Sequence, residues 1–184
     1  MNFDPAIHEY RDGDAIIPSV TQVLKRAGLI NDHWYSEEAR ERGSAVHTLC
    51  ERYAHGARLD DAGRTLASLE YINAFAAWMK RTRAYAIETE QFVDHALNGR
   101  RYAGRFDLMA EIDGFRVLID LKTGAKALWH PVQMAAYALP TNPERVMILY
   151  LKADGRYVQS YLTPSEIVHG IQQFKDALAQ GVKA

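Results

Sequence analysis

The chain has 184 residues, of which 48% are hydrophobic and 24% charged, so its composition is that of a globular domain and excludes a disordered or fibrous protein. Lysine and arginine (22) balance aspartate and glutamate (23), so binding a polyanion would need locally concentrated basic residues or a bound cation. A single cysteine, Cys50, excludes an internal disulfide and a cysteine-rich zinc or iron–sulfur site, which leaves oxygen and imidazole as metal ligands.

No apolar run reaches the roughly 18 residues that cross a bilayer, and the first residues lack the basic and apolar regions of a signal peptide. We therefore expect a cytoplasmic protein that does not bind membranes.

Helical patterns fill the first half of the chain. Residues 1–35 form a lead-in in which Ser19 begins a short helix, because Gln22 stands at capping-box spacing from it. Ser36 is the expected N-cap of a longer helix that runs to about residue 55, and a further apolar stripe predicts a helix over residues 65–83.

The second half alternates between strands and helices. Strands are predicted over residues 87–93, 102–112, 115–122, 145–152 and 156–162, and helices over 131–139 and 164–180. The sequence thus predicts one domain, residues 1–184, in which helices are followed by the order β-β-β-α-β-β-α.

Two aspartates face each other across one predicted hairpin. Asp113-Gly114 is a two-residue turn signal, and counting outward from it places Asp107 opposite Asp120. Strand alternation puts both acids and Lys122 on one polar face, with the apolar neighbours on the opposite side. Like charges at opposed positions repel, so the hairpin predicts either a bound cation or an ordinary solvated sheet face.

A pair of carboxylates beside a lysine is suited to metal-assisted phosphodiester cleavage. Carboxylate oxygens bind Mg²⁺ or Mn²⁺, which polarises a phosphate and lowers the pKa of a bound water, while an ammonium orients that water or stabilises charge. The Asp120-Leu121-Lys122 tripeptide carries little information by itself, and the opposed Asp107 adds to it.

Helices on either side of the hairpin offer further polar pairs at a spacing of four. His47 and Glu51 share one helix face, so His47 is a candidate ligand, with a surface ion pair as the alternative. Gln133 and Tyr137 share the face of the next helix, where Tyr137 is equally consistent with a core position.

Other charged residues near the hairpin give weaker signals. Glu90 is expected to lie at a solvated edge unless the strand register aligns it with Asp107. Arg100, Arg101 and Arg105 flank the hairpin entrance and are candidates for contacting phosphates.

Four motifs combine these residues with their neighbours: Gly43-x-x-x-His47-x-x-x-Glu51, Gly104-Arg105-Phe106-Asp107, Ile119-Asp120-Leu121-Lys122-Thr123-Gly124 and Gln133-x-x-x-Tyr137. Together they resemble the PD-(D/E)XK nuclease superfamily, and within it the RecB-like exonuclease branch. They occur in the family's order over about residues 36–152. The resemblance implies a restriction-endonuclease-like α-βββ-αβ core with a mixed central sheet flanked by helices.

The resemblance also implies roles for individual residues. It makes His47, Asp107, Asp120 and the Leu121 backbone carbonyl the ligands of Mg²⁺ or Mn²⁺. It makes Lys122 the catalytic lysine, which acts with Asp107 and Asp120. Gln133 and Tyr137 correspond to the family's last motif, which supports the site or contacts DNA. Leucine fills the position between Asp120 and Lys122, a form common among RecB-like members.

The expected function is therefore metal-dependent hydrolysis of DNA by an exonuclease or end-processing enzyme of recombination, repair or phage replication, encoded by a bacterium or phage. No phosphate-binding loop of an ATPase is present, so a helicase or recombination partner would be a separate chain. The alternatives are a site-specific endonuclease, a non-catalytic nucleic-acid-binding module and a hydrolase of small phosphate esters. Cleavage polarity, strand preference and oligomeric state do not follow from these motifs.

Overall fold

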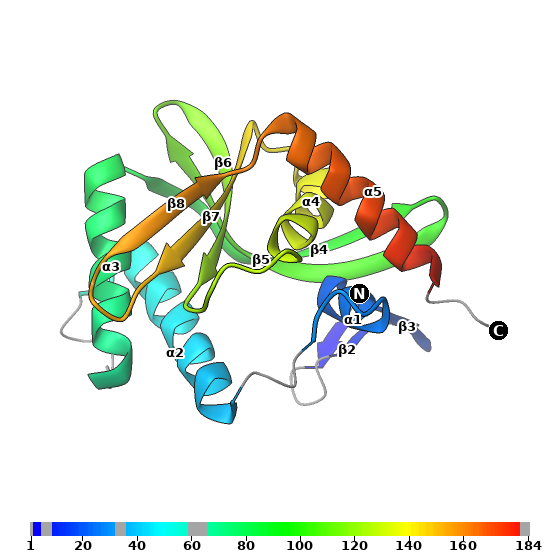
Figure 1. The fold of residues 1–184 in the computed structure, drawn as a ribbon, viewed down its shortest axis with the longest axis horizontal. Coiled ribbons are helices and arrows are strands. Elements are labelled where there is room, and N and C mark those ends of the chain that lie inside the picture. The colour runs from blue at the N-terminus through cyan, green and yellow to red at the C-terminus, as the bar shows by residue number, and fades with distance from the viewer. Residues whose placement is uncertain (1, 5–8, 32–35, 59–65, 181–184) are drawn as a thin grey trace.

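The structure, a computed structural model, describes residues 2–4, 9–31, 36–58 and 66–180 (Figure 1). The helices are α1 (Val20–Arg26), α2 (Glu37–Ala54), α3 (Leu66–Thr82), α4 (His130–Thr141) and α5 (Pro164–Gln180). The strands are β1 (Asn2–Asp4), β2 (Glu9–Asp12), β3 (Ala15–Ile17), β4 (Tyr85–Leu97), β5 (Arg100–Ile112), β6 (Phe115–Lys122), β7 (Arg145–Leu151) and β8 (Tyr157–Tyr161).

A mixed sheet of order β4-β5-β6-β7-β8 forms the centre of the fold. Strands β6 and β7 are parallel and the other neighbours are antiparallel. Helix α4 makes the crossover that a parallel pair requires. The expected α-βββ-αβ core with helices flanking a mixed sheet is confirmed.

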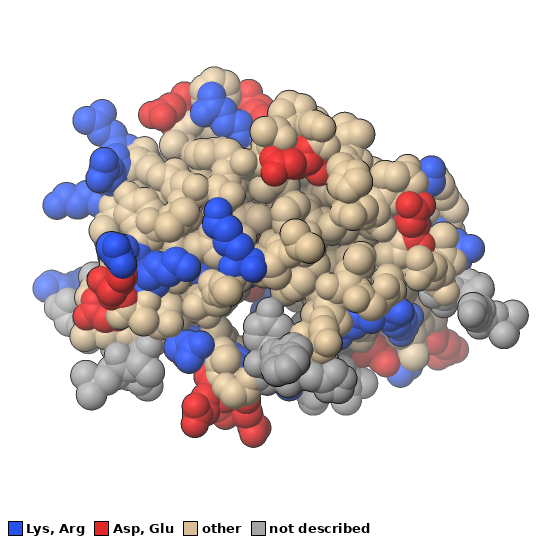
Figure 2. Space-filling view, viewed as in Figure 1, with Lys and Arg blue, Asp and Glu red and all other residues tan. Residues whose placement is uncertain are grey.

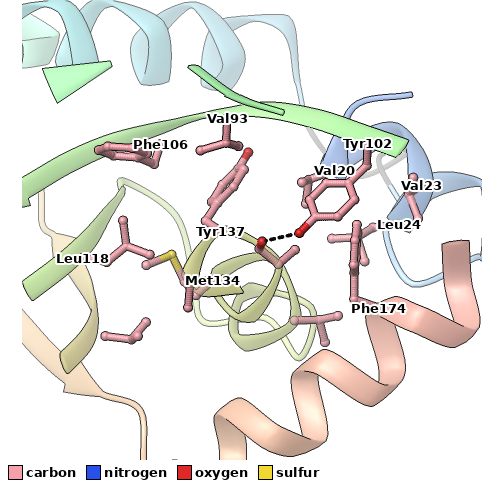
Figure 3. Close-up of a cluster of buried hydrophobic side chains, with 14 of the residues drawn as sticks. Val20, Val23, Leu24, Val93, Tyr102, Phe106, Leu118, Met134, Tyr137 and Phe174 are labelled. Carbon is pink, nitrogen blue, oxygen red and sulfur yellow. Dashed lines mark hydrogen bonds between the residues drawn. The ribbon is translucent and has the colours of Figure 1, made fainter. Parts of the chain in front are cut away.

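Helices cover both faces of the sheet, which explains why its central strands are apolar on both sides. One core lies between the sheet and α1, α4 and α5, and includes Tyr102, Leu118, Met134 and Phe174 (Figure 3). The other core lies between the sheet and α2 and α3, and includes Phe75. Among the described residues, no helix is both long and apolar enough to cross a membrane.

The helix starts agree with the capping residues. Ser19 Oγ accepts a hydrogen bond from the Gln22 amide at 3.1 Å, and Gln22 Oε1 accepts one from the Ser19 amide at 2.9 Å, which completes the predicted capping box. Ser36 caps α2 by accepting from the Ala39 amide at 3.2 Å. Residue 65, the predicted start of α3, lies outside the described residues.

The lead-in contains more structure than the sequence predicted. Strands β1, β2 and β3 form a small antiparallel sheet that precedes α1. Tyr10 of this sheet is 2% exposed and packs with Ile17 and Ala103, so the small sheet lies against β5. Strands of three or four residues show too little alternation to be recognised in a sequence.

Two long hairpins form the β4-β5-β6 part of the sheet. The predicted Asp113-Gly114 turn is present, with φ of 52° and 80° as a two-residue hairpin turn of type I′ requires. The ladder pairs Leu108 with Ile119 and Ile112 with Phe115, which confirms the predicted register. The Asn98–Gly99 turn joins β4 to β5 in the same way, with φ of 52° and 73°.

Candidate active site

The candidate site lies in a fork of the sheet, where β5 and β6 separate. Their ladder runs from the turn as far as Leu108 and Ile119, and Asp107 and Asp120 are the next residues on the two strands. Beyond this point β5 continues along β4, while β6 continues along β7, where Asp120 pairs with Ile148. The fork leaves room for side chains from α2 and α4 on either side.

Asp107, on the α2 side of the fork, is held by two groups. Its Oδ2 accepts a hydrogen bond from the Leu121 amide at 2.7 Å, and its Oδ1 lies 3.3 Å from Nδ1 of His47. The other imidazole nitrogen, Nε2, lies 2.9 Å from the Leu121 carbonyl oxygen. The imidazole thus bridges Asp107 and the Leu121 carbonyl, which the family resemblance implies is a metal ligand.

The ionisation of this pair follows from its charges. Burial lowers the pKa of His47, but the Asp107 carboxylate outweighs that effect and raises it to about 9. Burial would raise the pKa of Asp107, yet the charge and hydrogen bond of His47, with Lys122 and the Leu121 amide, lower it. The imidazolium therefore supplies positive charge between two potential ligands when no metal is bound.

Asp120, Lys122 and Gln133 form the α4 side of the fork. The Lys122 ammonium lies 2.6 Å from Asp120 Oδ2 and donates to Gln133 Oε1 at 3.0 Å. Burial raises the pKa of Asp120, which is 4% exposed, although the neighbouring ammonium opposes this effect. The lysine side chain is thus fixed by one residue of its own strand and one of α4.

The prediction of one polar sheet face shared by both acids and Lys122 is wrong. Leu121 belongs to the core beneath α2 and α3, so Asp120 and Lys122 point to the other side, toward α4. Asp107 instead contacts His47 of α2. Both faces are covered by helices, and the acids come together only because the strands separate there.

Glu90 belongs to the site, whereas a solvated edge was expected for it unless the strand register aligned it with Asp107. Ligand atoms of His47, Glu90 and Asp107 all lie within 4.8 Å of one another. The β4–β5 ladder pairs Thr89 with Leu108 and Gln91 with Phe106, which places Glu90 opposite Asp107 and meets the condition set for it. Counting outward from the Asn98–Gly99 turn gives this alignment from sequence alone.

The backbone at Glu90 is in an unusual conformation for a strand residue, with a φ of 50°. On β5, Phe106 and Leu108 flank Asp107, the residue opposite Glu90. Phe106 belongs to the core on the α4 side and Leu108 to the core on the α2 side, although regular alternation would put them on one face. Alternation therefore changes phase at the Glu90–Asp107 position. Both carboxylates thereby turn toward His47, and burial together with Asp107 raises the pKa of Glu90 to about 7.

This donor set fits a divalent cation. Two carboxylates and an imidazole offer hard oxygen and nitrogen ligands, and the Leu121 carbonyl oxygen is adjacent to the imidazole. Mutual repulsion of the acids is relieved in the protein by His47 and Lys122, the positive groups that adjoin Asp107 and Asp120. A cation held by His47, Glu90 and Asp107 would neutralise the same charges.

The site opens into a cavity of about 410 Å³ between α2, α4 and the β4–β5 hairpin. The residues that line the cavity include Tyr10, His47, Glu51, Glu90, Asp107 and Gln133. A second hollow of about 270 Å³ adjoins it at His47 and is lined by Leu121, Lys122 and Trp129. The contribution of Tyr10 was not predicted, because residues 1–35 were expected to form only a lead-in to the domain.

Tyr137 is mostly buried in the core and also lines the cavity. It is 5% exposed and packs among Val93 and Phe106, under the β4–β5 hairpin (Figure 3). Gly104 is required above it, because a Cβ there would lie 2.5 Å from Tyr137 Cε1. Both of the alternatives considered for Tyr137, core and cavity wall, therefore apply.

The predicted arginine cluster is divided. Arg105 lines the cavity and its Nε lies 2.7 Å from Glu90 Oε2, whereas Arg101 is held between Asp12 and Asp94 at 2.7 and 2.6 Å. Figure 2 shows more of the basic groups on the left half of that face, with acidic groups scattered over both halves. Only Arg105 of the three arginines adjoins the site.

Several solved structures align with this chain over most of its length. A protein from Eubacterium rectale that has been assigned as an exonuclease aligns with a TM-score of 0.57 and 15% identity, over 91% of this chain and 83% of that one. LHK-Exo in complex with dAMP aligns over 89% of this chain and 87% of its own at 14% identity, with a TM-score of 0.43. A phage-related exonuclease from Haemophilus somnus aligns over 88% and 91% at 12% identity, also with a TM-score of 0.43.

No protein-family model matches the sequence, and no curated protein matches it. At 15% identity, the alignment with the Eubacterium rectale protein shows a common fold.

Proposed function

We propose that this chain is a metal-dependent nuclease that hydrolyses DNA phosphodiester bonds, acting as an exonuclease on DNA ends. The observation that carries the proposal is the meeting of His47, Asp107, Asp120 and Lys122 in one fork of the sheet. The exonuclease assignment of the Eubacterium rectale protein, which has the same fold, supports the same reaction class.

The ligands we assign are His47, Glu90, Asp107 and the Leu121 carbonyl, with Asp120 on the opposite side of the fork. When bound, Mg²⁺ or Mn²⁺ would polarise the phosphate and lower the pKa of a coordinated water. Asp107 is oriented for ligation by the Leu121 amide, which fixes one of its oxygens and leaves the other directed toward His47. This hydrogen bond sets the carboxylate geometry before any ligand arrives.

Lys122 is the residue we assign to charge stabilisation at the scissile phosphate. Its ammonium is held by Asp120 and Gln133, so little side-chain freedom is lost when it acts. It faces the hollow that adjoins the cavity at His47, which places a fixed positive charge next to the metal ligands. An ammonium in this position can orient the attacking water or stabilise the negative charge that develops in the transition state.

A cleavage time course tests the proposal. End-labelled linear DNA and covalently closed circular DNA are incubated with the parent protein in Mg²⁺, in Mn²⁺ and in EDTA. We expect loss of the linear substrate in both metals and none in EDTA, with the closed circle intact. Lys122→Ala should lower the cleavage rate by about 10²–10³-fold, the usual loss when one charge-stabilising donor is removed.

Lys80→Ala is the matched control, because Lys80 is an exposed lysine in the last turn of α3. It should cleave at the parent rate. Equal cleavage of the closed circle would identify an endonuclease. Absence of cleavage by the folded parent in both metals would overturn the proposal and favour a non-catalytic binding module. Hydrolysis of nucleoside monophosphates in place of DNA would identify a small-ester hydrolase.

A further inference from the structure

Three aromatic rings from three strands gather beside the cavity. Phe3 of β1 and Tyr10 of β2 have ring centroids 4.7 Å apart, and Phe92 of β4 lies 5.5 Å from Phe3 and 6.1 Å from Tyr10. Tyr10 is 2% exposed, whereas Phe92 is 49% exposed. The small N-terminal sheet thus supports the Phe92 ring on one side and leaves half of it open to solvent.

A positive charge is fixed next to this open ring. Arg105 is the direct cross-strand partner of Phe92, and its guanidinium carbon lies 5.8 Å from the ring centroid. The Arg105 Nε atom is held 2.7 Å from Glu90 Oε2. Because Tyr10, Glu90 and Arg105 all line the 410 Å³ cavity, the ring and its arginine stand at the rim of the candidate active site.

The spacing from this rim to the site matches that of a nucleic-acid strand. Arg105 precedes Asp107 by two residues on β5, which is about 6.6 Å along a strand. Stacked bases rise by about 3.4 Å per nucleotide. A base that stacked on Phe92 would therefore belong to a nucleotide one or two positions from a phosphate at Asp107.

We propose that Phe92 is a stacking platform for an unpaired base of a DNA strand next to the scissile phosphate, with Arg105 as the adjacent cation. The proposal deepens the nuclease function proposed above and rests on it. An exposed aromatic ring offers a π-face to any base, and arginine adds charge attraction for the backbone. Bases inside a duplex are already stacked on both sides, so this surface selects single-stranded or frayed DNA ends.

Another exposed phenylalanine supplies the control. Phe115 is 36% exposed and has the Arg145 guanidinium carbon 3.5 Å from its ring centroid. It follows the Asp113–Gly114 turn, at the end of the hairpin away from the fork. Phe115 thus matches Phe92 in residue type and in its arginine partner but not in position.

Binding of a fluorescein-labelled oligothymidine and of a labelled blunt duplex is measured by anisotropy in EDTA, where the proposed metal is removed. Phe92→Ala should weaken oligothymidine binding by roughly ten- to hundredfold, the loss expected for one base–aromatic stack. Phe92→Leu should lose most of the same affinity while keeping an apolar side chain of similar size. Phe92→Trp should bind at least as tightly as the parent, and Phe115→Ala should bind like the parent.

The inference is overturned if folded Phe92→Leu and Phe92→Ala bind oligothymidine as tightly as the parent. It is also overturned if the parent binds no single-stranded DNA. Thermal melting confirms folding, and if Phe92→Ala does not fold, Phe92→Leu decides the result. A Phe92-dependent self-association in sedimentation would also overturn it, because the ring would then face a second copy. Cleavage and EDTA binding are independent readouts, so Phe92-dependent binding without any cleavage would refute the nuclease function and leave the single-strand surface standing.

Discussion

The β5–β6 hairpin has two halves that differ in almost every respect. In the closed half, from the turn to Leu108 and Ile119, the ladder is regular and the apolar side chains alternate between the two cores. In the open half the two strands separate and polar side chains such as Asp120 are buried. Strand β4, which pairs with β5 there, contains Glu90 with a positive φ. The irregular backbone and buried charges of the open half destabilise the fold. The apolar side chains buried in the closed half stabilise it.

This division of roles predicts that changes in the closed half affect stability and changes in the open half affect ligand binding. The following experiments test that separation.

Ile119→Ala should cause the largest loss of stability. Ile119 is fully buried in the core under α2 and α3, and truncating a buried isoleucine costs about 2–5 kcal/mol. Urea denaturation measures the loss, with Ile119→Val as the milder control at about 0.5–1.5 kcal/mol. Calorimetric Mn²⁺ affinity of the folded fraction should be unchanged, and a weakened affinity would contradict the separation of the two halves.

Metal should stabilise the parent through the open half. A cation that binds only the native state adds about 2.7 kcal/mol at a hundredfold excess over its Kd, seen as a higher Tm. Asp107→Asn should shrink this metal-dependent shift, because it removes a ligand. Asp113→Asn removes a carboxylate from the turn of the same hairpin and should keep the full shift, so equal losses in the two variants would argue against a site at the fork.

Two glycines near the site should respond to alanine in opposite directions. At Gly104 an added Cβ would lie 2.5 Å from Tyr137 Cε1, and such overpacking costs about 1–3 kcal/mol. At Gly43, inside α2, the nearest atom to an added Cβ is Thr123 Oγ1 at 3.9 Å, so Gly43→Ala should stabilise the protein by about 0.5–1 kcal/mol. Thermal melting compares them, and destabilisation by both would mean that the α2 side is as tightly packed as the hairpin.

Acid should destabilise the protein through His130, which begins α4. Burial, followed by the charge of Lys122, lowers the pKa of His130 to about 3. Its Nδ1 accepts hydrogen bonds from the Ala127 amide at 3.4 Å and the Tyr150 hydroxyl at 3.0 Å, so the native ring is neutral.

The unfolded chain binds this proton near pH 6.5, so stability from this group is complete above that pH and falls as the pH drops from 6.5 toward 3. The slope is at most about 1.4 kcal/mol per pH unit for one proton. His130→Asn keeps an acceptor near the Nδ1 position without titrating, and urea midpoints between pH 4 and 7.5 should depend less on pH in this variant. An unchanged slope would assign the acid sensitivity to other groups.

Local sequence signals predicted the elements that depend on a few neighbouring residues. Ser19 and Gln22 placed the start of α1, and Ser36 placed the start of α2, because a cap involves atoms within one helical turn. The Asp113–Gly114 turn placed the β5–β6 register, because a two-residue turn fixes every opposed pair that follows. These signals were sufficient to bring Asp107 and Asp120 to the same point of the sheet.

Tertiary structure alone decided how the site is assembled around that point. Counting from a turn aligns Glu90 with Asp107, but its side chain turns toward His47 through a change of alternation that has no local sequence signature. His47 meets a carbonyl 74 residues further along the chain. Tyr10 reaches the cavity from strands too short to show a pattern. Periodicity describes a regular strand, whereas a fork, a phase change and the packing of α2 are set by contacts between distant segments, which is why the ligand arrangement required the fold.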